Sequence, residues 1–581
     1  MSDAALPAHG DAEKEADIRA AANPILAANN LRIAEMILRV HRRARGLGWN
    51  ALRASMPRVL VAMVAMLAMS GAAAWAGVAP TKLMAEKCGA CHLQKGKSFD
   101  RITDMRKSPE GWDMTLVRMG VWHQVDISRS ERKVLVRYLA DTQGLAPEES
   151  APYRFIMERR PNAEDVVPTP ELTQMCTGCH SFGRVALQRR DLGEWRELVQ
   201  THVGEMPSVE YAGQDRTVNW LDLAMGKVAP ELAELYPLRS KAWTKWRRAK
   251  HVAPSGNWRV VGERPGWGGY SGYMFVRPLG ADRYAVKYEL VYDSGNRVSG
   301  EGKANLYTGY EWRGASTLGN QRIHSVFALS ADGRELSGRW FLRDADEVGA
   351  RLEAVRMNAA SQGEILAVSP AFIKAGATTT VRVSGVKLGG TYELGPGIKI
   401  DKVVRVSGDE VQLVATVAQG AAIGWRKLEQ GQSGHDAKIA VYRQIDTLRV
   451  EPAFAIARLG GGGGANPPVS AQFEAIAYIN GPDGKPGTPD DIRLGRVNAQ
   501  WSVENRTERA KTANDVKFAG VMQPDGQFIP AQAGPNPARA NHADNIGNLS
   551  AVATLADGHR LIKSSGHLIV TVQSWKRPPL R

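Results

Sequence analysis

Residues 88–92 read Cys-Gly-Ala-Cys-His, and residues 176–180 read Cys-Thr-Gly-Cys-His. These two copies of one CxxCH pattern contain all 4 cysteines of the 581-residue chain. Two thiols at this spacing can bond to the two vinyl groups of one haem, and the adjacent histidine then ligates the iron. A zinc site or redox-active disulfides would use the same cysteines. The repeated histidine favours two covalent haems, attached through Cys88, Cys91, Cys176 and Cys179, with His92 and His180 as iron ligands.

An internal repeat predicts the second ligand of each iron. Trp112 and Trp195 each begin a similar segment and lie 83 positions apart, and the same offset places His123 on Met206. Histidine and methionine are the usual distal ligands of six-coordinate c-type haems. The expected iron ligands are therefore His92 and His123 for the first haem, and His180 and Met206 for the second.

Other distal ligands remain open at this point. Met105, Met114 or Met119 could ligate the first haem, although a methionine on a helix is more often a core residue. His202 competes with Met206 for the second haem, and it aligns with Met119 at the same offset. That variant would move both distal ligands to the earlier position.

Each copy is predicted to form a small helical cytochrome c unit, at about 77–147 and about 165–245. Together they form an all-α dihaem domain at 77–250. Two six-coordinate irons leave no open site for oxygen or peroxide, so we expect an electron relay without a catalytic residue in this chain. A thioether ligand favours reduced iron more than a second imidazole does, which gives the electron a direction.

The second half of the chain has the alternating pattern and the Gly and Asp-Gly turns of β structure. About eight such runs predict an antiparallel β-barrel domain at 251–364. Residues 368–372 (Val-Ser-Pro-Ala-Phe) and 450–454 (Val-Glu-Pro-Ala-Phe) are similar openings, which predict two immunoglobulin-like sandwiches at 365–446 and 447–581. No catalytic constellation is recognisable in these β-domains. The Asp- and Gly-rich residues 480–491 lack the ligand spacing of an EF-hand, so we interpret them as a turn and leave calcium open.

The N-terminal region carries a targeting signal. Residues 56–76 combine a basic flank, a short apolar run and small residues, which predicts a secretory signal peptide cleaved after about Ala76 and a periplasmic protein. Residues 1–55 remain an unexplained extension, and later starts at Met36 or Met56 are available. The alternative is a cytoplasmic tail with an uncleaved anchor, although the apolar run is short for a membrane span. The net charge of +15 is spread among acidic residues, which argues against nucleic-acid binding.

Two CxxCH motifs followed by one barrel-like and two immunoglobulin-like domains resemble the alpha subunit, a dihaem cytochrome c, of quinohemoprotein amine dehydrogenase. The resemblance covers nearly all of residues 77–581 and rests on the domain order, the motifs at Cys88 and Cys176, and the paired Pro-Ala-Phe openings. It implies that primary amines are oxidised at a tryptophan-derived quinone in a small partner subunit, within a heterotrimer that includes a β-propeller subunit. Electrons then pass through the two haems to a soluble blue copper protein or a cytochrome c.

Two other functions compete with this relay. A self-contained dihaem enzyme such as a peroxidase needs one iron with a vacant or labile sixth site. Whether His123 ligates the first haem therefore distinguishes such an enzyme from the relay. A haem-bearing binding module would instead use exposed aromatic clusters on its β-domains and remain a monomer, whereas the relay subunit needs a large contact surface for its partners.

Overall fold

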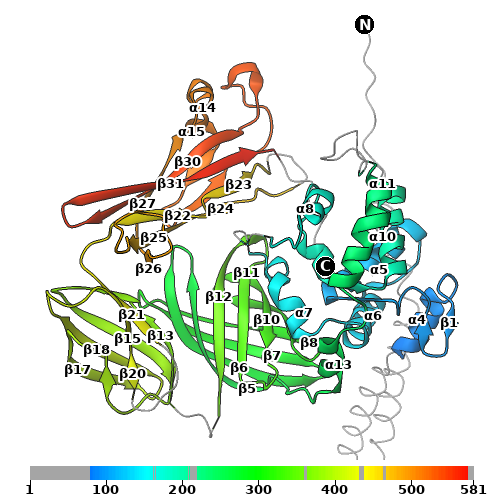
Figure 1. The fold of residues 1–581 in the computed structure, drawn as a ribbon, viewed down its shortest axis with the longest axis horizontal. Coiled ribbons are helices and arrows are strands. Elements are labelled where there is room, and N and C mark those ends of the chain that lie inside the picture. Colours follow the sequence, from blue (N-terminus) through cyan, green and yellow to red (C-terminus); the bar gives the residue numbers. More distant parts are fainter. Residues whose placement is uncertain are drawn as a thin grey trace, which may run out of the picture. The chain divides into compact units, whose positions relative to one another are not determined.

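The computed structural model describes residues 79–160, 163, 165–206, 209, 219–358, 363–430, 437–461 and 466–572. Residues from Leu83 onward form one compact unit, shown in Figure 1. The predicted extension at 1–55, the signal peptide at 56–76 and the Pro207 that follows Met206 lie outside the described residues. No helix among the described residues is both long and apolar enough to cross a membrane.

The region before residue 250 is mainly helical and contains the predicted repeat. The first repeat, residues 80–142, comprises helices α4 (Pro80–Cys88), α5 (Pro109–His123) and α6 (Arg129–Thr142). The second repeat, residues 170–235, comprises α8 (Pro170–Cys176), α9 (Gly183–Ala186), α10 (Leu192–Glu205), α11 (Trp220–Leu223), the π-helical turn η3 (Ala224–Val228) and α12 (Ala229–Leu235). Between and after them lie α7 (Pro147–Ser150), η1 (Ala151–Ile156) and α13 (Lys241–Arg248).

The region is not purely helical, because it contains two small antiparallel sheets that periodicity did not predict. One is the pair β1 (Gln94–Lys95) and β2 (Ser98–Phe99), just after the first motif. The other joins β3 (Met105–Lys107) of the first repeat to β4 (Gln188–Arg190) of the second. Strands this short carry no alternation that sequence reading can detect.

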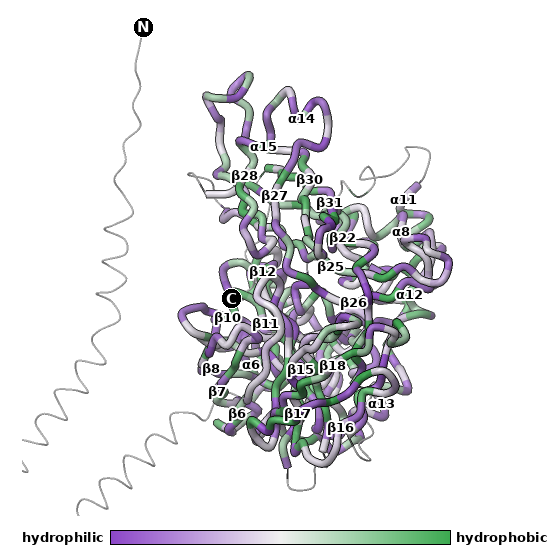
Figure 2. Tube along the Cα trace, turned by 90° about the vertical axis from the view of Figure 1, so that its left-hand side faces the viewer, coloured by the Kyte–Doolittle hydropathy of each residue, from purple (hydrophilic) through white to green (hydrophobic). Residues whose placement is uncertain are grey.

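The predicted barrel is present as eight antiparallel strands in one closed sheet. Hydrophobic and hydrophilic residues both occur along its strands (Figure 2), and along residues 283–292 every second side chain is buried. The inward side chains fill the barrel, with Trp258, Trp312 and Trp340 each nearly fully buried. The strands are β5 (Gly256–Arg264), β6 (Gly268–Gly280), β7 (Arg283–Tyr292), β8 (Arg297–Tyr307), β9 (Glu311–Leu318), β10 (Gln321–Leu329), β11 (Glu335–Leu342) and β12 (Ala345–Met357).

The next region has two main sheets around one apolar core. The four-stranded sheet contains β13 (Glu364–Ser369), β15 (Thr378–Val386), β18 (Glu410–Val417) and β17 (Ile398–Ser407). The three-stranded sheet contains β14 (Phe372–Lys374), β21 (Lys438–Tyr442) and β19 (Gly424–Lys427), and β16 (Tyr392–Glu393) pairs with β20 (Glu429–Gln430).

The last region has three sheets and a second apolar core. The first sheet contains β22 (Thr447–Glu451), β25 (Glu474–Ile479) and β26 (Ile492–Arg496). The second contains β23 (Phe454–Arg458), β31 (Arg560–Thr571), β30 (Gly547–Asp557) and β27 (Gln500–Asn505). The third contains β24 (Ala471–Gln472), β29 (Gln527–Pro530) and β28 (Gly520–Met522). Short helices α14 (Glu508–Ala513), α15 (Asp515–Phe518) and η4 (Ala540–His542) complete it. The immunoglobulin-like assignment of these two regions stays a prediction.

The two Pro-Ala-Phe openings have the same structural role. At residues 368–372 the chain leaves β13 in one sheet and enters β14, which pairs in parallel with β21 of another sheet. At residues 450–454 it leaves β22 and enters β23, which pairs in parallel with β31. The repeated sequence therefore marks the point where each region's first strand pair changes sheets.

Candidate haem sites

The first motif forms a tight turn at the end of α4. The N–H groups of Cys91 and His92 both donate to the carbonyl of Cys88, at 3.2 and 2.9 Å. Both thiols are free, with Cys88 half-buried and Cys91 exposed. Burial and the nearby Cys91 raise the pKa of the Cys88 thiol. A thioether is uncharged, so it suits this half-buried position better than a thiolate would.

The second motif begins in the same way, at the last residue of α8. Cys176 is half-buried and Cys179 is exposed, and both are free. Burial raises the pKa of Cys176 to about 11. After the motif, the Asp165 carboxylate accepts hydrogen bonds from the N–H groups of Phe182 and Gly183, at 2.7 and 3.2 Å. This carboxylate fixes the backbone that immediately follows His180.

The two motif histidines each have a backbone carbonyl on Nδ1. His92 Nδ1 lies 3.0 Å from the carbonyl oxygen of Asp100, and His180 Nδ1 lies 3.0 Å from that of Ser181. A backbone carbonyl on Nδ1 selects the tautomer in which Nε2 is the free electron-pair donor, an arrangement typical of iron- and zinc-ligating histidines. In both side chains Nε2 is therefore the nitrogen left to bind a metal.

The predicted distal residues lie at the C-terminal ends of equivalent helices. Helix α5 begins after the N-cap Ser108 and ends at His123, which is exposed. Helix α10 begins after the N-cap Asp191, and Met206 follows its last residue with 47% of its surface exposed. The N–H of Met206 donates to the carbonyl of His202 at 2.8 Å, which fixes its backbone.

Two competing residues, Met119 and His202, lie one helical turn earlier, whereas Met114 lies further back in α5 and Met105 is buried in β3. His202 is partly buried, its Nδ1 lies 2.7 Å from the Leu198 carbonyl oxygen, and its ring lies against Trp220 with centroids 6.3 Å apart. Burial lowers the pKa of His180, and the charge of His202 acts in the same direction. His202 thus has a backbone carbonyl on Nδ1, as His180 does, and Nε2 is left as its electron-pair donor.

Both repeats show side chains that suit a flat, largely apolar group bearing hydrogen-bond acceptors. In the first repeat, Leu93, Val121 and Trp122 flank the predicted ligands and remain 63%, 69% and 37% exposed. In the second repeat, the buried indole nitrogens of Trp195 and Trp220 have no hydrogen-bond acceptor among the described residues. Haem, with its apolar ring and carboxylates, would cover the former and offer acceptors to the latter.

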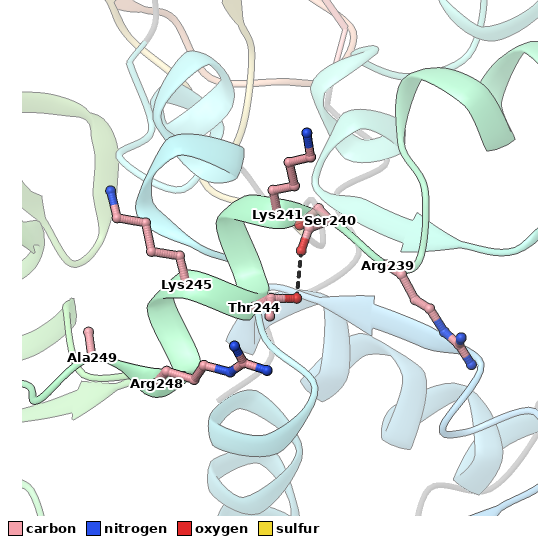
Figure 3. Close-up of a pocket in the computed structure, with 7 residues that line it drawn as sticks. All are labelled: Arg239, Ser240, Lys241, Thr244, Lys245, Arg248 and Ala249. Atoms are coloured by element: carbon pink, nitrogen blue, oxygen red, sulfur yellow. Dashed lines mark hydrogen bonds between the residues drawn. The ribbon is translucent and has the colours of Figure 1, made fainter.

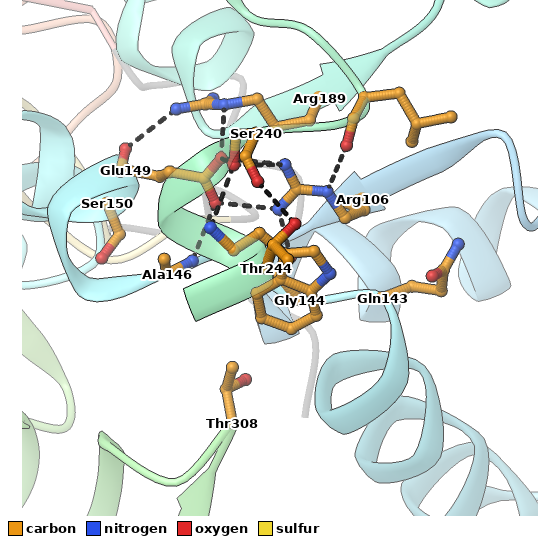
Figure 4. Close-up of polar contacts among 12 residues, drawn as sticks. Arg106, Gln143, Gly144, Ala146, Glu149, Ser150, Arg189, Ser240, Thr244 and Thr308 are labelled. Carbon is orange, nitrogen blue, oxygen red and sulfur yellow. Dashed lines mark hydrogen bonds and ion pairs between the residues drawn. The ribbon is translucent and has the colours of Figure 1, made fainter. Parts of the chain in front are cut away.

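The two repeats are joined at equivalent residues. Strands β3 and β4 pair antiparallel with Arg106 opposite Arg189, two residues separated by the same offset of 83. Both guanidinium groups bind the buried Glu149, which α7 supplies from between the repeats (Figure 4). Arg106 donates to both carboxylate oxygens at 2.8 Å, and Arg189 Nε donates at 3.2 Å. The two arginines are related by the 83-residue offset, but nothing in the sequence marks Glu149 as their partner.

Glu149 also connects this pair to the helix that follows the second repeat. Ser240, the N-cap of α13, donates its hydroxyl to the carboxylate at 2.8 Å. Burial by itself raises the pKa of Glu149, but the hydrogen bonds from Arg106 and the charge of Arg189 lower it to about 2. The cluster therefore stays ionised and holds the two repeats at one fixed register.

Comparison with known protein families decides the identity of the chain. The haem-binding model of the quinohemoprotein amine dehydrogenase alpha subunit matches residues 78–243, which include both CxxCH motifs. Models of alpha-subunit domains II, III and IV match residues 251–357, 362–443 and 448–580.

The chain belongs to the family of quinohemoprotein amine dehydrogenase alpha subunits. It is thus a haem-binding subunit of an oxidoreductase, and an alpha subunit implies other subunits in the assembly. Domain II of this alpha subunit corresponds to the closed barrel, and domains III and IV to the two regions that follow it.

The alpha subunit is also similar to several solved structures, but only in part. A redesigned β-barrel, mFAP1, bound to DFHBI is 16% identical over 18% of this chain and 98% of its own, with a TM-score of 0.16. A glucan-utilisation protein of Bacteroides ovatus, SGBP-B, in complex with a heptasaccharide is 12% identical over 55% of this chain and 64% of its own, with a TM-score of 0.18. Scores this low carry no functional argument. Comparison with curated proteins finds no match.

The Asp- and Gly-rich loop of domain IV forms a turn held by its own polar groups. Asp483 accepts from the N–H of Lys485 at 2.8 Å, Asp491 accepts from the N–H of Gly487 at 2.7 Å, and Asp491 also forms an ion pair with Arg449. Among the described residues of the alpha subunit, no group of three or more His, Cys, Asp or Glu side chains is placed to hold a metal ion.

Proposed function

We propose that this alpha subunit holds two c-type haems and relays electrons through them in a periplasmic amine dehydrogenase. The electrons come from a tryptophan-derived quinone in a small partner subunit, beside a β-propeller subunit, and leave to a soluble blue copper protein or a cytochrome c. The carrying observation is that both repeats present two free cysteines and a histidine whose Nδ1 is already bound to a backbone carbonyl.

The residues of the chain divide into attachment, ligation and positioning. Cys88 and Cys91 would attach the first haem, and Cys176 and Cys179 the second, with His92 and His180 as proximal ligands. When bound, each haem supplies a one-electron iron centre. The Asp100 and Ser181 carbonyls hold the two imidazole rings in the ligating tautomer, and Glu149 holds the repeats together.

His123 and Met206 remain our distal ligands, because the shared offset makes them equivalent and they end the same helix in each repeat. A second ligand set, Met119 and His202, is favoured by one observation, the Leu198 carbonyl on Nδ1 of His202, which leaves Nε2 as the electron-pair donor. Both sets give one haem with two histidines and one with histidine and methionine, but in opposite repeats. Either set closes both irons, and neither supports a peroxidase.

The test is to purify the assembly with its partner subunits and record subunit masses and the haem spectrum with and without a primary amine. We expect smaller subunits to co-purify and the amine to reduce both haems. A lone dihaem protein that ignores amines and reacts with peroxide would reject the relay and support a self-contained enzyme. Mass spectrometry of the mature N-terminus tests the predicted signal cleavage after about Ala76 in the same preparation.

A further inference from the structure

One face of α13, together with Arg239 just before the helix, carries a dense group of cations. Arg239, Lys241, Lys245 and Arg248 line a hollow of about 720 Å³ together with Ser240, Thr244 and Ala249 (Figure 3). The four cationic side chains belong to exposed residues, and no carboxylate lines the hollow. Within the described part of the chain, none of the four takes part in an ion pair. We name these four residues the α13 cationic face.

The helix that carries this face is rigidly seated. Trp243 and Trp246 lie on its other side and belong to the apolar core of the barrel. The indole of Trp246 donates to the Thr308 carbonyl at 2.8 Å, and the guanidinium of Arg106 lies 5.1 Å from the Trp243 ring. The cations are therefore displayed from a fixed backbone, which lowers the entropy that a partner must remove on binding.

The lack of ion pairs with described residues sets this face apart from other basic residues nearby. Arg106, Arg189 and Arg190, in the adjoining repeats, are buried and each is paired with a carboxylate. A cluster of four unpaired positive charges is kept at the expense of mutual repulsion, and an external acidic surface relieves that repulsion.

The geometry points to the occupant. A helix of eight residues is about 12 Å long, so its cations match carboxylates spread over a protein face better than one small anion. The aromatic residues of α13 are buried, which removes the stacking surface that single-stranded nucleic acid would use. The N-cap Ser240 binds Glu149, which in turn binds Arg106 of the first repeat, so the face is rigidly coupled to the haem region.

We propose that the α13 cationic face is the docking surface for the electron acceptor, and that this acceptor is a small protein with an acidic surface around its redox centre. The proposal rests on the relay function above and specifies where the electrons leave. Opposite charges would steer the encounter and accelerate association, and salt would screen this effect.

The experiment uses the complete amine dehydrogenase assembly with its haems reduced. An acidic c-type cytochrome and a basic one are mixed with it in separate stopped-flow series at ionic strengths from about 10 mM upwards. The double variant Lys241→Glu/Lys245→Glu is compared with Lys402→Glu/Lys563→Glu, which makes the same charge change at exposed lysines of domains III and IV. Subunit masses and the haem spectrum verify that each assembly is intact.

We expect the α13 variant to lower the second-order rate constant with the acidic cytochrome by about tenfold or more at low salt, and the control to change it by less than about twofold. The effect should vanish at high salt and be absent or reversed with the basic cytochrome. Equal rates for the two variants would overturn the proposal, as would loss of a resident subunit from the α13 variant alone, since the face would then be a subunit contact. Haems reduced chemically instead of by amine give the same comparison, so a failure of the relay function is seen separately.

Discussion

The first repeat keeps a lysine over its buried tryptophan, whereas the second keeps an arginine at the same register. Lys107 Nζ lies 5.2 Å from the Trp112 ring centroid, and the Arg190 guanidinium lies 5.7 Å from that of Trp195. Arg190 is ion-paired with Glu194, but the position equivalent to Glu194 in the first repeat is a glycine. Lys107 donates to the hydroxyl of Thr115 instead, and burial and the charge of Arg190 hold its pKa well below its usual value.

The repeats also differ in how they meet the barrel. The first is tied by charge, since Glu110 at the start of α5 forms an ion pair with Arg313, which also reaches Glu311 at 3.4 Å. The second is tied by packing, since Val326 and Phe341 of the barrel belong to its apolar core. The two repeats thus share one arrangement of the backbone but differ in their polar contacts. Such differences would give the two proposed haems different potentials, because axial ligands, burial and nearby charges set the potential.

Exchanging the predicted distal ligand of the second repeat should remove the difference between the two midpoint potentials. Met206→His gives both predicted iron sites two histidines, so we expect the second midpoint potential to fall by on the order of 0.1 V or more towards the first. A spectroelectrochemical titration should then show two waves that merge. His202→Ala is the matched control and should leave the waves apart. If His202→Ala alone changes the spectrum, the distal ligands lie one turn earlier, at Met119 and His202.

Removing the carboxylate that both repeats share should lower the stability of both repeats together. Glu149→Leu leaves Arg106 and Arg189 buried without their counter-charge, so we expect the free energy of unfolding to fall by about 3–5 kcal/mol. Denaturant unfolding followed through each haem's absorbance measures it. Glu148→Gln, at the exposed neighbouring residue, should change the stability by less than about 0.5 kcal/mol. A transition that splits into two, with only one haem released early, would show that Glu149 is not a common anchor.

The contribution of Glu311 to the free energy of unfolding should change with pH in the opposite sense to that of Glu149. Burial raises the pKa of Glu311 to about 7 from 4.5, so the folded state binds the proton more tightly than the unfolded chain. Its stabilising contribution, about 3 kcal/mol, is complete below about pH 4.5 and is lost as the pH rises through about 7. Glu149, with its pKa of about 2, contributes above pH 4.5 and is lost as the pH falls towards 2. Glu311→Gln should flatten the unfolding free energy between pH 5 and 8, and an unchanged slope there would contradict this assignment.

Sequence reading reached the haem motifs, the 83-residue offset and the closed barrel because each has a local or periodic signal. The CxxCH spacing is local, and the alternation of buried and exposed residues along β7 has a period of two. The contacts between repeats had no such signal. Glu149 is an ordinary acidic residue until β3 and β4 pair, and two strands of three residues each carry no periodicity. The α13 cationic face was likewise hidden, because only the burial of Trp243 and Trp246 shows which side of the helix is exposed.

The smallest expected effect concerns the two equivalent tryptophans. Trp112 donates its indole N–H to the Gln143 carbonyl at 2.9 Å, whereas the buried indole of Trp195 has no acceptor among the described residues. Because the bound haem can supply that acceptor, we expect Trp112→Phe and Trp195→Phe to destabilise the haem-loaded protein equally, each losing one hydrogen bond worth about 1 kcal/mol besides packing. Equilibrium unfolding of both variants side by side measures the difference. A cost for Trp195→Phe that is lower by about 1 kcal/mol would mean that the indole stays unpaired and that the haem carboxylates lie elsewhere in the second repeat.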